Sequence, residues 1–196
     1  MSVPAAAFAQ TAAEPPEQIL DVATDPDSRT LLDDVSPPNT TPSDEHEWLH
    51  QMVGEWEGTS ELVTGPGAEP VKIKARVKTR MLGAFWLVSE IESEFPGQPM
   101  KGLQTVGYDP VAGQYIGTWV DSTGPTVWKY TGRVDESGKT LALDAKGPNV
   151  VTGEGESNYR DSYTIVSPDE VKQVSEMQMP DGTWQTFMTY TMNRVK

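Results

Sequence analysis

Hydrophobic and polar residues alternate with a period of two over most of the chain after residue 54. In residues 71–80 four apolar or small residues alternate with lysine and arginine. Successive side chains of a β-strand point to opposite faces, so this pattern predicts a strand with one buried and one solvated face. Similar segments follow at short spacing. The predicted strands are 55–63, 71–80, 84–95, 101–109, 114–121, 126–134, 139–146, 157–167, 170–179 and 183–194.

The connections between these strands are short and rich in turn-forming residues. Pro96-Gly97, Asp109-Pro110 and Pro180-Asp181-Gly182 lie between successive strands, and Gly, Pro and Asp favour tight turns. Ten strands without a long crossover indicate an antiparallel up-and-down order. Closure removes every exposed edge, so we predict an all-β antiparallel barrel of about ten strands. A β-sandwich is the alternative.

One helical segment precedes the strands. Thr41 can act as the N-cap, and Pro42 suits the first helical position. The spacing predicts a short helix over 43–53 that turns Trp48 and Leu49 to one face. We expect this N-terminal helix to close one end of the barrel in a single domain over 44–196.

The first 43 residues differ from the rest of the chain. Residues 10–43 are acidic and proline-rich with few hydrophobic residues, which predicts a disordered tail. Residues 1–9 resemble the end of a secretory signal, with Ala7-Phe8-Ala9 as an A-x-A cleavage site, although the basic region and most of the apolar core are missing. We expect export to the periplasm or the outside of the cell, with the cytoplasm as the alternative.

Composition excludes several classes of function. The formal net charge is −14, which disfavours binding to nucleic-acid phosphates or anionic lipid. The chain has no cysteine and two histidines, and no apolar run approaches the roughly 20 residues that span a bilayer. We predict no nucleic-acid partner and no membrane insertion. The oligomeric state stays open, with a dimer as one possibility.

No cofactor or metal site is predicted either. His46 and His50 lie one helical turn apart, a spacing that can ligate zinc, but no third ligand accompanies them. The glycine-rich segment 153–156 contains acids that would repel phosphate. It is typical of a loop, here one that could cover the mouth of a barrel.

The aromatic residues point to a binding pocket. Large rings can line a cavity for an apolar or planar ligand, and a barrel of ten strands is wider than side chains alone would fill. We therefore predict that the protein binds a small hydrophobic or aromatic molecule. A filled barrel with a structural or interaction role is one alternative. The predicted ligand-binding residues are Trp56, Tyr108, Trp119, Asp121, Tyr130, Tyr163 and Trp184.

Carboxylates offer a second alternative, an enzyme. Asp121 shares a strand face with Trp119 and would be the polar anchor of the pocket. If Asp161 faced Asp121, the pair could act as an acid–base group on an uncharged substrate. Glu90 and its neighbours 92 and 94 alternate with an apolar face, so we predict that they point outward.

Several motifs resemble those of a known bacterial family. Glu45-His46-Glu47-Trp48-Leu49, Val53-Gly54-Glu55-Trp56-Glu57-Gly58, Gly107-Tyr108-Asp109 and Gly117-Thr118-Trp119-Val120-Asp121-Ser122 are similar, in this order, to domain-of-unknown-function family 1579. The resemblance covers about 44–196 and implies a lipocalin-like barrel without an established activity. Where members often carry Gly-Gly-Arg-Phe, this chain has Gly83-Ala84-Phe85-Trp86, so an arginine of the family is missing.

Overall fold

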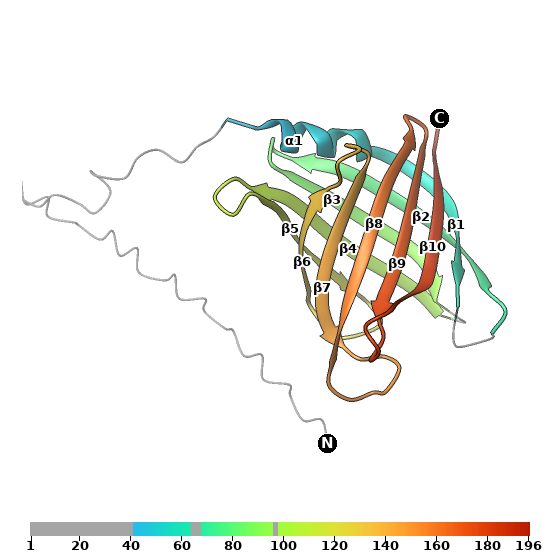
Figure 1. The fold of residues 1–196 in the computed structure, drawn as a ribbon. Helices are drawn as coiled ribbons and strands as arrows, with labels where there is room; N and C mark the ends of the chain where they lie inside the picture. Colours follow the sequence, from blue (N-terminus) through green and yellow to red (C-terminus); the bar gives the residue numbers. More distant parts are fainter. Residues whose placement is uncertain (1–40, 64–67, 96–97) are drawn as a thin grey trace, which may run out of the picture. The chain divides into compact units, whose positions relative to one another are not determined.

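Ten strands form a closed antiparallel barrel (Figure 1). The computed structural model describes residues 41–63, 68–95 and 98–196. Each strand pairs with its neighbours in sequence, and β1 pairs with β10 to close the sheet. The predicted up-and-down barrel is thus confirmed. The strands are β1 Gly54–Leu62, β2 Val71–Leu82, β3 Trp86–Phe95, β4 Gln98–Asp109, β5 Gln114–Asp121, β6 Trp128–Val134, β7 Thr140–Pro148, β8 Glu156–Ser167, β9 Glu170–Gln178 and β10 Trp184–Arg194.

A short helix precedes the barrel. α1 spans Asp44–Leu49 and continues into a 3-10 turn, η1, over His50–Met52. Its N-cap is Ser43, not Thr41 as predicted. The backbone N–H of Ser43 donates to Nδ1 of His46 at 3.0 Å, so His46 takes the place that Glu or Gln holds in a capping box. The predicted signal remnant and most of the predicted disordered tail fall on residues 1–40, outside the described residues.

The helix covers one end of the barrel, which we call the helix end; the opposite end is the far end (Figure 1). Trp48 Nε1 donates to the carbonyl of Gly138 at 2.8 Å, and the Tyr115 hydroxyl donates to the carbonyl of Glu45 at 2.9 Å. Leu49 has no exposed surface. The predicted role of the helix as a plug is therefore confirmed. No helix in the described part of the chain is long and apolar enough to cross a membrane.

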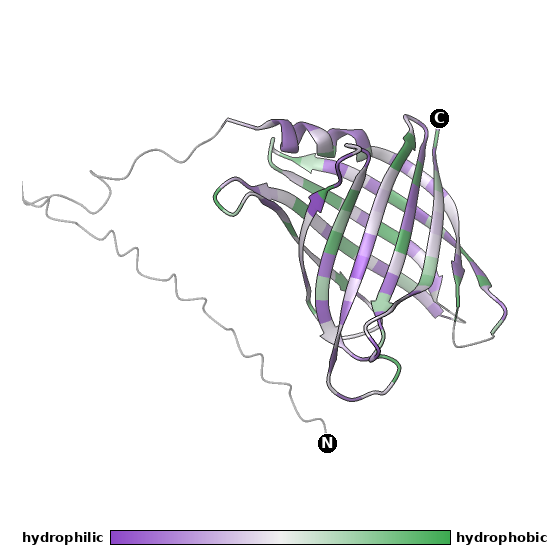
Figure 2. Ribbon diagram, in the orientation of Figure 1, coloured by the Kyte–Doolittle hydropathy of each residue, from purple (hydrophilic) through white to green (hydrophobic). Residues whose placement is uncertain are grey.

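Hydrophilic and hydrophobic residues alternate along the strands (Figure 2). The polar residues of this pattern are mostly exposed on the outer face, as the alternation predicts. Cations of β2 pair with acids of β1, for example Lys78 with Glu55 at 3.2 Å. On the neighbouring strands Lys101 pairs with Glu92 at 3.3 Å, and Glu90 is exposed. The cationic strand is thus a solvated face with acidic neighbours, and the glutamates of β3 point outward as predicted.

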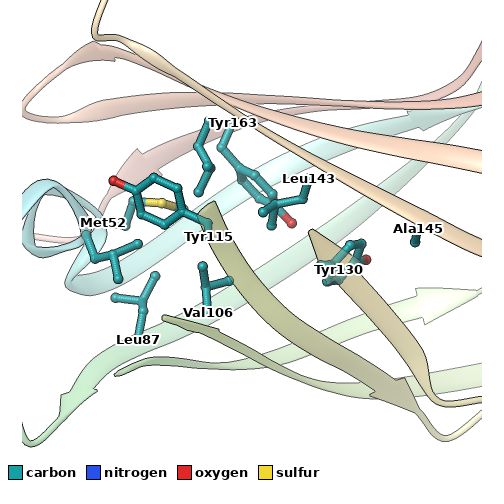
Figure 3. Close-up of a cluster of buried hydrophobic side chains, with 10 residues drawn as sticks. Met52, Leu87, Val106, Tyr115, Tyr130, Leu143, Ala145 and Tyr163 are labelled. Carbon is teal, nitrogen blue, oxygen red and sulfur yellow. The ribbon is translucent and has the colours of Figure 1, made fainter. Parts of the chain in front are cut away.

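The interior near the helix end is filled by large apolar side chains. Leu87, Leu141 and Val106 are each at most 2% exposed and pack in one cluster with Leu49 and Tyr115. Figure 3 shows Leu87, Val106 and Tyr115 of this cluster. Burial of such side chains is worth about 1.5–3 kcal/mol each. This part of the barrel is a conventional hydrophobic core.

Two inward-facing glycines let neighbouring strands approach closely. A Cβ on Gly58 would lie 2.2 Å from the carbonyl oxygen of Thr191, and one on Gly132 would lie 2.0 Å from that of Ala142. Backbone cannot move aside as a flexible side chain can, so only glycine fits. Such positions allow the strands to coil as closure of a barrel requires.

Candidate functional site

Polar side chains replace the apolar core in the middle of the barrel. Gln104 Nε2 donates to the Tyr163 hydroxyl at 2.8 Å. These residues belong to β4 and β8, which are four strands apart around the wall, so this bond crosses the interior. Thr79 Oγ1 donates to Ser89 Oγ at 3.1 Å on the neighbouring strands. We name as the polar layer Thr79, Ser89, Gln104, Tyr130, Asp161, Tyr163, Gln173 and Ser175.

Asp161 is the carboxylate of the polar layer. The Tyr130 hydroxyl donates to its Oδ2 at 2.6 Å, and the Ser175 hydroxyl donates to its Oδ1 at 2.5 Å. Burial raises the pKa of Asp161; the hydrogen bonds from Ser175, Tyr130 and Gln173 lower it but do not cancel the effect of burial. An ionised carboxylate in this position is therefore held at a cost.

The Asp161 side chain nevertheless keeps some accessible surface. The residue is partly exposed, while Tyr130 and Ser175 beside it are only 7% and 1% exposed. Asp161 lies on the inner face, because its neighbour Arg160 points outward and pairs with Asp144. A side chain can be deeply enclosed by protein and still have accessible surface when that surface faces the interior of the barrel. Asp161 therefore lines a space inside the barrel.

Two indole rings lie flat against the wall between the polar layer and the far end. Trp119 of β5 and Trp128 of β6 are directly opposite each other in the sheet. A Cβ on Gly102 of β4 would lie 2.2 Å from the Trp119 ring, and one on Gly147 of β7 would lie 2.3 Å from the Trp128 ring. The indoles thus cover glycines on opposite sides, away from each other. The Trp128 ring also packs edge-on against Tyr159 of β8, with ring centroids 4.9 Å apart.

Both small and large residues continue this wall, since Tyr159 of β8 and Met177 of β9 are 8% and 5% exposed. Ser60 of β1 and Ala145 of β7 are buried inward-facing residues, as is Ser175 of β9. Short side chains occupy less of the barrel than the leucines near the helix, and a barrel of ten strands has a wide interior to fill. We call the interior between the polar layer and the far end the far half, and the interior between the polar layer and α1 the helix half.

Comparison with protein-family models identifies the family of this chain. A family model described as "Protein of unknown function (DUF1579)" matches residues 41–194. The chain belongs to the DUF1579 family. The match covers the helix and every strand, which confirms the resemblance seen in the sequence motifs.

Solved structures share the fold of this DUF1579 protein at low sequence identity. The crystal structure of Rv2717c from M. tuberculosis is similar with a TM-score of 0.57 and 15% identity, covering 80% of this chain and 100% of that chain. The S-type phycobiliprotein lyase CPES from Guillardia theta is similar with a TM-score of 0.54 and 16% identity, covering 79% and 94%. The comparison with curated proteins found no match.

The structure brings four of the seven predicted ligand-binding residues to the middle or far half of the interior. Tyr130 and Tyr163 belong to the polar layer. Trp119 lies on the wall of the far half, and its Nε1 donates to Oδ2 of Asp121 at 2.8 Å. Asp121 is at the end of β5. These four residues come from three different strands, and the fold brings them to the same part of the interior.

The other three predicted residues lie elsewhere. Trp56 is 2% exposed near the helix end, where its Nε1 donates to the carbonyl of Met52 at 2.9 Å. Tyr108 packs edge-on against His46 beneath the helix, with ring centroids 5.8 Å apart. Trp184 lies on the outer face, because the Arg160 guanidinium stacks on its ring at 4.6 Å. A shift of register in β10 between Thr186 and Met188 limits what alternation can predict there.

Three residues of the site carry signals in the sequence that the aromatic pattern obscures. Gln104 and Ser175 are polar residues on strand faces that are otherwise apolar or small, next to Val106 and Met177 respectively. Trp128 opens a strand directly opposite Trp119. A single polar residue on an otherwise apolar strand face is the sequence signal that indicates the polar layer.

The two aspartates have separate partners. Oδ1 of Asp121 accepts bonds from the backbone N–H and the hydroxyl of Thr123 at 2.8 and 2.5 Å. Burial alone would raise the pKa of Asp121, but the bonds from Thr123 and Trp119 bring it below its usual value. Asp161 is bonded by Tyr130 and Ser175 instead. Asp121 therefore orients Trp119 and a turn, while Asp161 faces the interior.

His46 belongs to the cap of α1. His46-Glu47-Trp48-Leu49-His50 has the His-Glu-x-x-His spacing of zinc metalloproteases. His46, however, is 4% exposed and its Nδ1 is bonded to Ser43. Among the described residues no group of three or more His, Cys, Asp or Glu side chains could hold a metal ion.

A shallow cleft of about 450 Å³ lies on β3, β4 and β5, and Gly102 and Asp121 are among its lining residues. Glu90, Glu92 and Lys101 line it together with Leu103 and Val120, which are 41% and 36% exposed. The site of interest is the interior, because the enclosed carboxylate and the indoles lie there.

Proposed function

We propose that this DUF1579 protein binds a small, largely apolar or aromatic molecule in the far half of its barrel. The observation that carries the proposal is the interior-facing surface of Asp161, in a barrel whose wall also carries two indoles that lie flat over glycines. Flat rings offer a large apolar surface to a planar ligand, and one polar group fixes its orientation. We propose also that the protein acts outside the cytoplasm.

The binding role is favoured over an enzyme by the partners of the two aspartates. An acid–base pair requires two groups that share a substrate or a proton. Asp121 is committed to Thr123 and Trp119, and Asp161 to Tyr130 and Ser175. The fold itself does not decide the matter, because one similar structure is named a lyase.

The first test is to look for a bound molecule. Protein purified without denaturation is examined by native mass spectrometry and then titrated with the neutral fluorescent probe N-phenyl-naphthylamine. We expect a mass above that of the chain, or saturable enhancement of probe emission with one site per barrel. A barrel that carries no ligand and leaves the emission unchanged would be filled, with a structural role.

A matched pair of variants locates the site. A Cβ on Gly147 would push the Trp128 indole into the interior, whereas a Cβ on Gly124 would meet nothing within 4 Å. Gly147→Ala should therefore weaken probe binding, and Gly124→Ala, in the turn after β5, should leave it unchanged. Equal binding by both variants would place the probe outside the far half.

A further inference from the structure

Asp161 is an enclosed carboxylate without a cationic partner. The groups that act on it are the hydroxyls of Ser175 and Tyr130 and the amide of Gln173, all uncharged. Among the described residues it takes part in no ion pair, whereas Asp144 on the outer face pairs with Arg160. Buried charges in proteins are normally paired or bind a cation. The charge that would balance Asp161 is thus missing from the wall.

The carboxylate also has unused acceptor capacity. Each of its oxygens accepts one bond from a hydroxyl, and the Gln173 amide also acts on the group, whereas an ionised carboxylate offers about four acceptor positions. Tyr130 and Ser175 approach from β6 and β9, on either side of β8. The remaining positions face the interior, where Asp161 keeps its accessible surface. A donor group on a ligand could reach them.

A second polar group on the wall lacks a partner. Ser60 is 0% exposed, and its Oγ is a buried side-chain atom without a hydrogen-bond partner. Ser60 lies opposite Tyr190 of β10, and Tyr190 lies opposite Gln173 of the polar layer. A buried hydroxyl of this kind costs about 1–3 kcal/mol unless something bonds to it. Ser60 has no accessible surface, so its hydroxyl does not line the space beside Asp161, and the carboxylate is the polar group that a ligand could reach.

The charge of the whole protein favours the same kind of ligand. The formal net charge of −14 creates a field that attracts cations and repels anions. Glu154 and Asp181 lie in exposed connections at the far end, the β7–β8 and β9–β10 loops. An anionic ligand would meet this field on approach and Asp161 inside.

We propose that the ligand is an aromatic or apolar cation, whose protonated nitrogen donates a hydrogen bond to Asp161. The inference rests on the proposed interior binding. The side chains that face Asp161 from the packed strands are Tyr130 on β6, Leu143 on β7, Tyr163 on β8, and Gln173 and Ser175 on β9. None of these carries a positive charge, so the ligand supplies it. The carboxylate then gains a charge-assisted bond in an enclosed site.

The test compares three ligands of nearly equal shape. Naphthylmethylamine is a cation at pH 7, ethylnaphthalene is its neutral analogue, and naphthylacetate is an anion. Their dissociation constants are measured by displacement of N-phenyl-naphthylamine. A hydrogen bond to a charged group predicts that the amine binds about 10- to 100-fold more tightly than ethylnaphthalene, with the acetate weakest.

Two aspartate variants test whether Asp161 causes this preference for the amine. Asp161→Asn should bring the amine and ethylnaphthalene to within about threefold of each other, because the amide carries no charge. Asp144→Asn removes an exposed carboxylate from the outer face and should keep the full preference. If Asp161→Asn does not fold, Ser175→Ala keeps the carboxylate and frees one oxygen. That variant should increase the preference for the amine, and a decrease would contradict the inference.

The outcomes separate the two proposals. Equal binding of amine and hydrocarbon by the wild-type protein would overturn the cation but leave interior binding intact. Binding of neither the ligands nor the probe would overturn both. Preference for the amine that survives Asp161→Asn would place the cation at another site and reject the role of Asp161.

Discussion

The two halves of the barrel interior are built on opposite principles. The helix half is closed by α1 and packed with leucine, valine and tyrosine that have almost no exposed surface. The far half has indoles laid flat over Gly102 and Gly147, a mixture of small residues and large ones such as Tyr159, and one carboxylate at its inner limit. Both halves are formed by the same ten strands. The two halves differ in the helix that closes one of them and in the carboxylate at the inner limit of the other.

This difference indicates how the protein divides stability from function. A packed core stabilises the folded state through close contacts between side chains, and a cavity removes such contacts. A buried carboxylate with neutral partners opposes folding, and natural proteins retain such groups where they serve a site. We therefore expect substitutions in the helix half to change stability and substitutions in the far half to change binding.

The largest effect is expected for a leucine of the helix half. Leu141 is 1% exposed, so Leu141→Ala should lower the free energy of unfolding by about 2–5 kcal/mol, as measured by urea denaturation. Probe affinity of the folded fraction should change little. Leu103→Ala on the outer face is the control and should cost about 0.5 kcal/mol or less. Equal losses in the two variants would mean that the helix half is not the main core.

Substitution of a glycine in the far half should have a smaller effect on stability and should also change probe binding. Gly102→Ala forces the Trp119 ring off the wall and breaks its bond to Asp121. We expect a loss of about 1–3 kcal/mol in stability together with a shifted tryptophan emission and weaker probe binding. Gly124→Ala is the matched control. Unchanged emission in Gly102→Ala would show that the ring does not depend on this glycine.

Removal of the Asp161 carboxylate should raise the free energy of unfolding, whereas the two substitutions above lower it. Burial raises the pKa of Asp161, so the folded state holds its proton more tightly than the unfolded state does. Such a group lowers stability as pH rises through its unfolded value of 3.8 and its higher folded value. Asp161→Asn should therefore increase the free energy of unfolding at pH 7, and the gain should shrink as the pH falls toward 3.8. Urea denaturation at several pH values measures this. A loss that grows toward neutral pH would mean that the ionised carboxylate stabilises the barrel.

The smallest effect is expected on the outer face. Lys72 and Glu61 are 3.8 Å apart and both well exposed. Glu61→Gln should change the free energy of unfolding by about 0.5 kcal/mol or less, and salt should reduce the change further. A larger change would show that the outer ion pairs contribute to stability as much as part of the core does.

The sequence predicts the barrel well because alternation and turn residues report local structure. Strands around Val71 and Trp119, and the turns between strands, follow from the period of two and from Gly, Pro and Asp. The helix position is predicted to within one residue of its start, but its cap is not. Ser43 caps because His46 bonds back to it, and a histidine in that place is not part of the usual capping signature.

The site is predicted only in part because it depends on contacts between distant strands. Trp119 and Tyr130 follow from the aromatic pattern, but the pattern alone cannot separate them from Trp56, which packs near the helix end. The pairing of Asp161 with Tyr130 joins residues 31 positions apart. Trp184 follows a turn in a strand with a register shift, so its face could not be read from alternation.

The six tryptophans allow a direct test of interior binding in the far half. In a proton–nitrogen NMR spectrum each indole N–H gives one signal, and Trp48 and Trp56 report on the helix end, Trp119 and Trp128 on the far half, and Trp86 and Trp184 on the outer face. On titration with naphthylmethylamine we expect the signals of Trp119 and Trp128 to shift and the other four to stay in place. Shifts confined to Trp86 and Trp184, or to Trp48 and Trp56, would contradict binding in the far half.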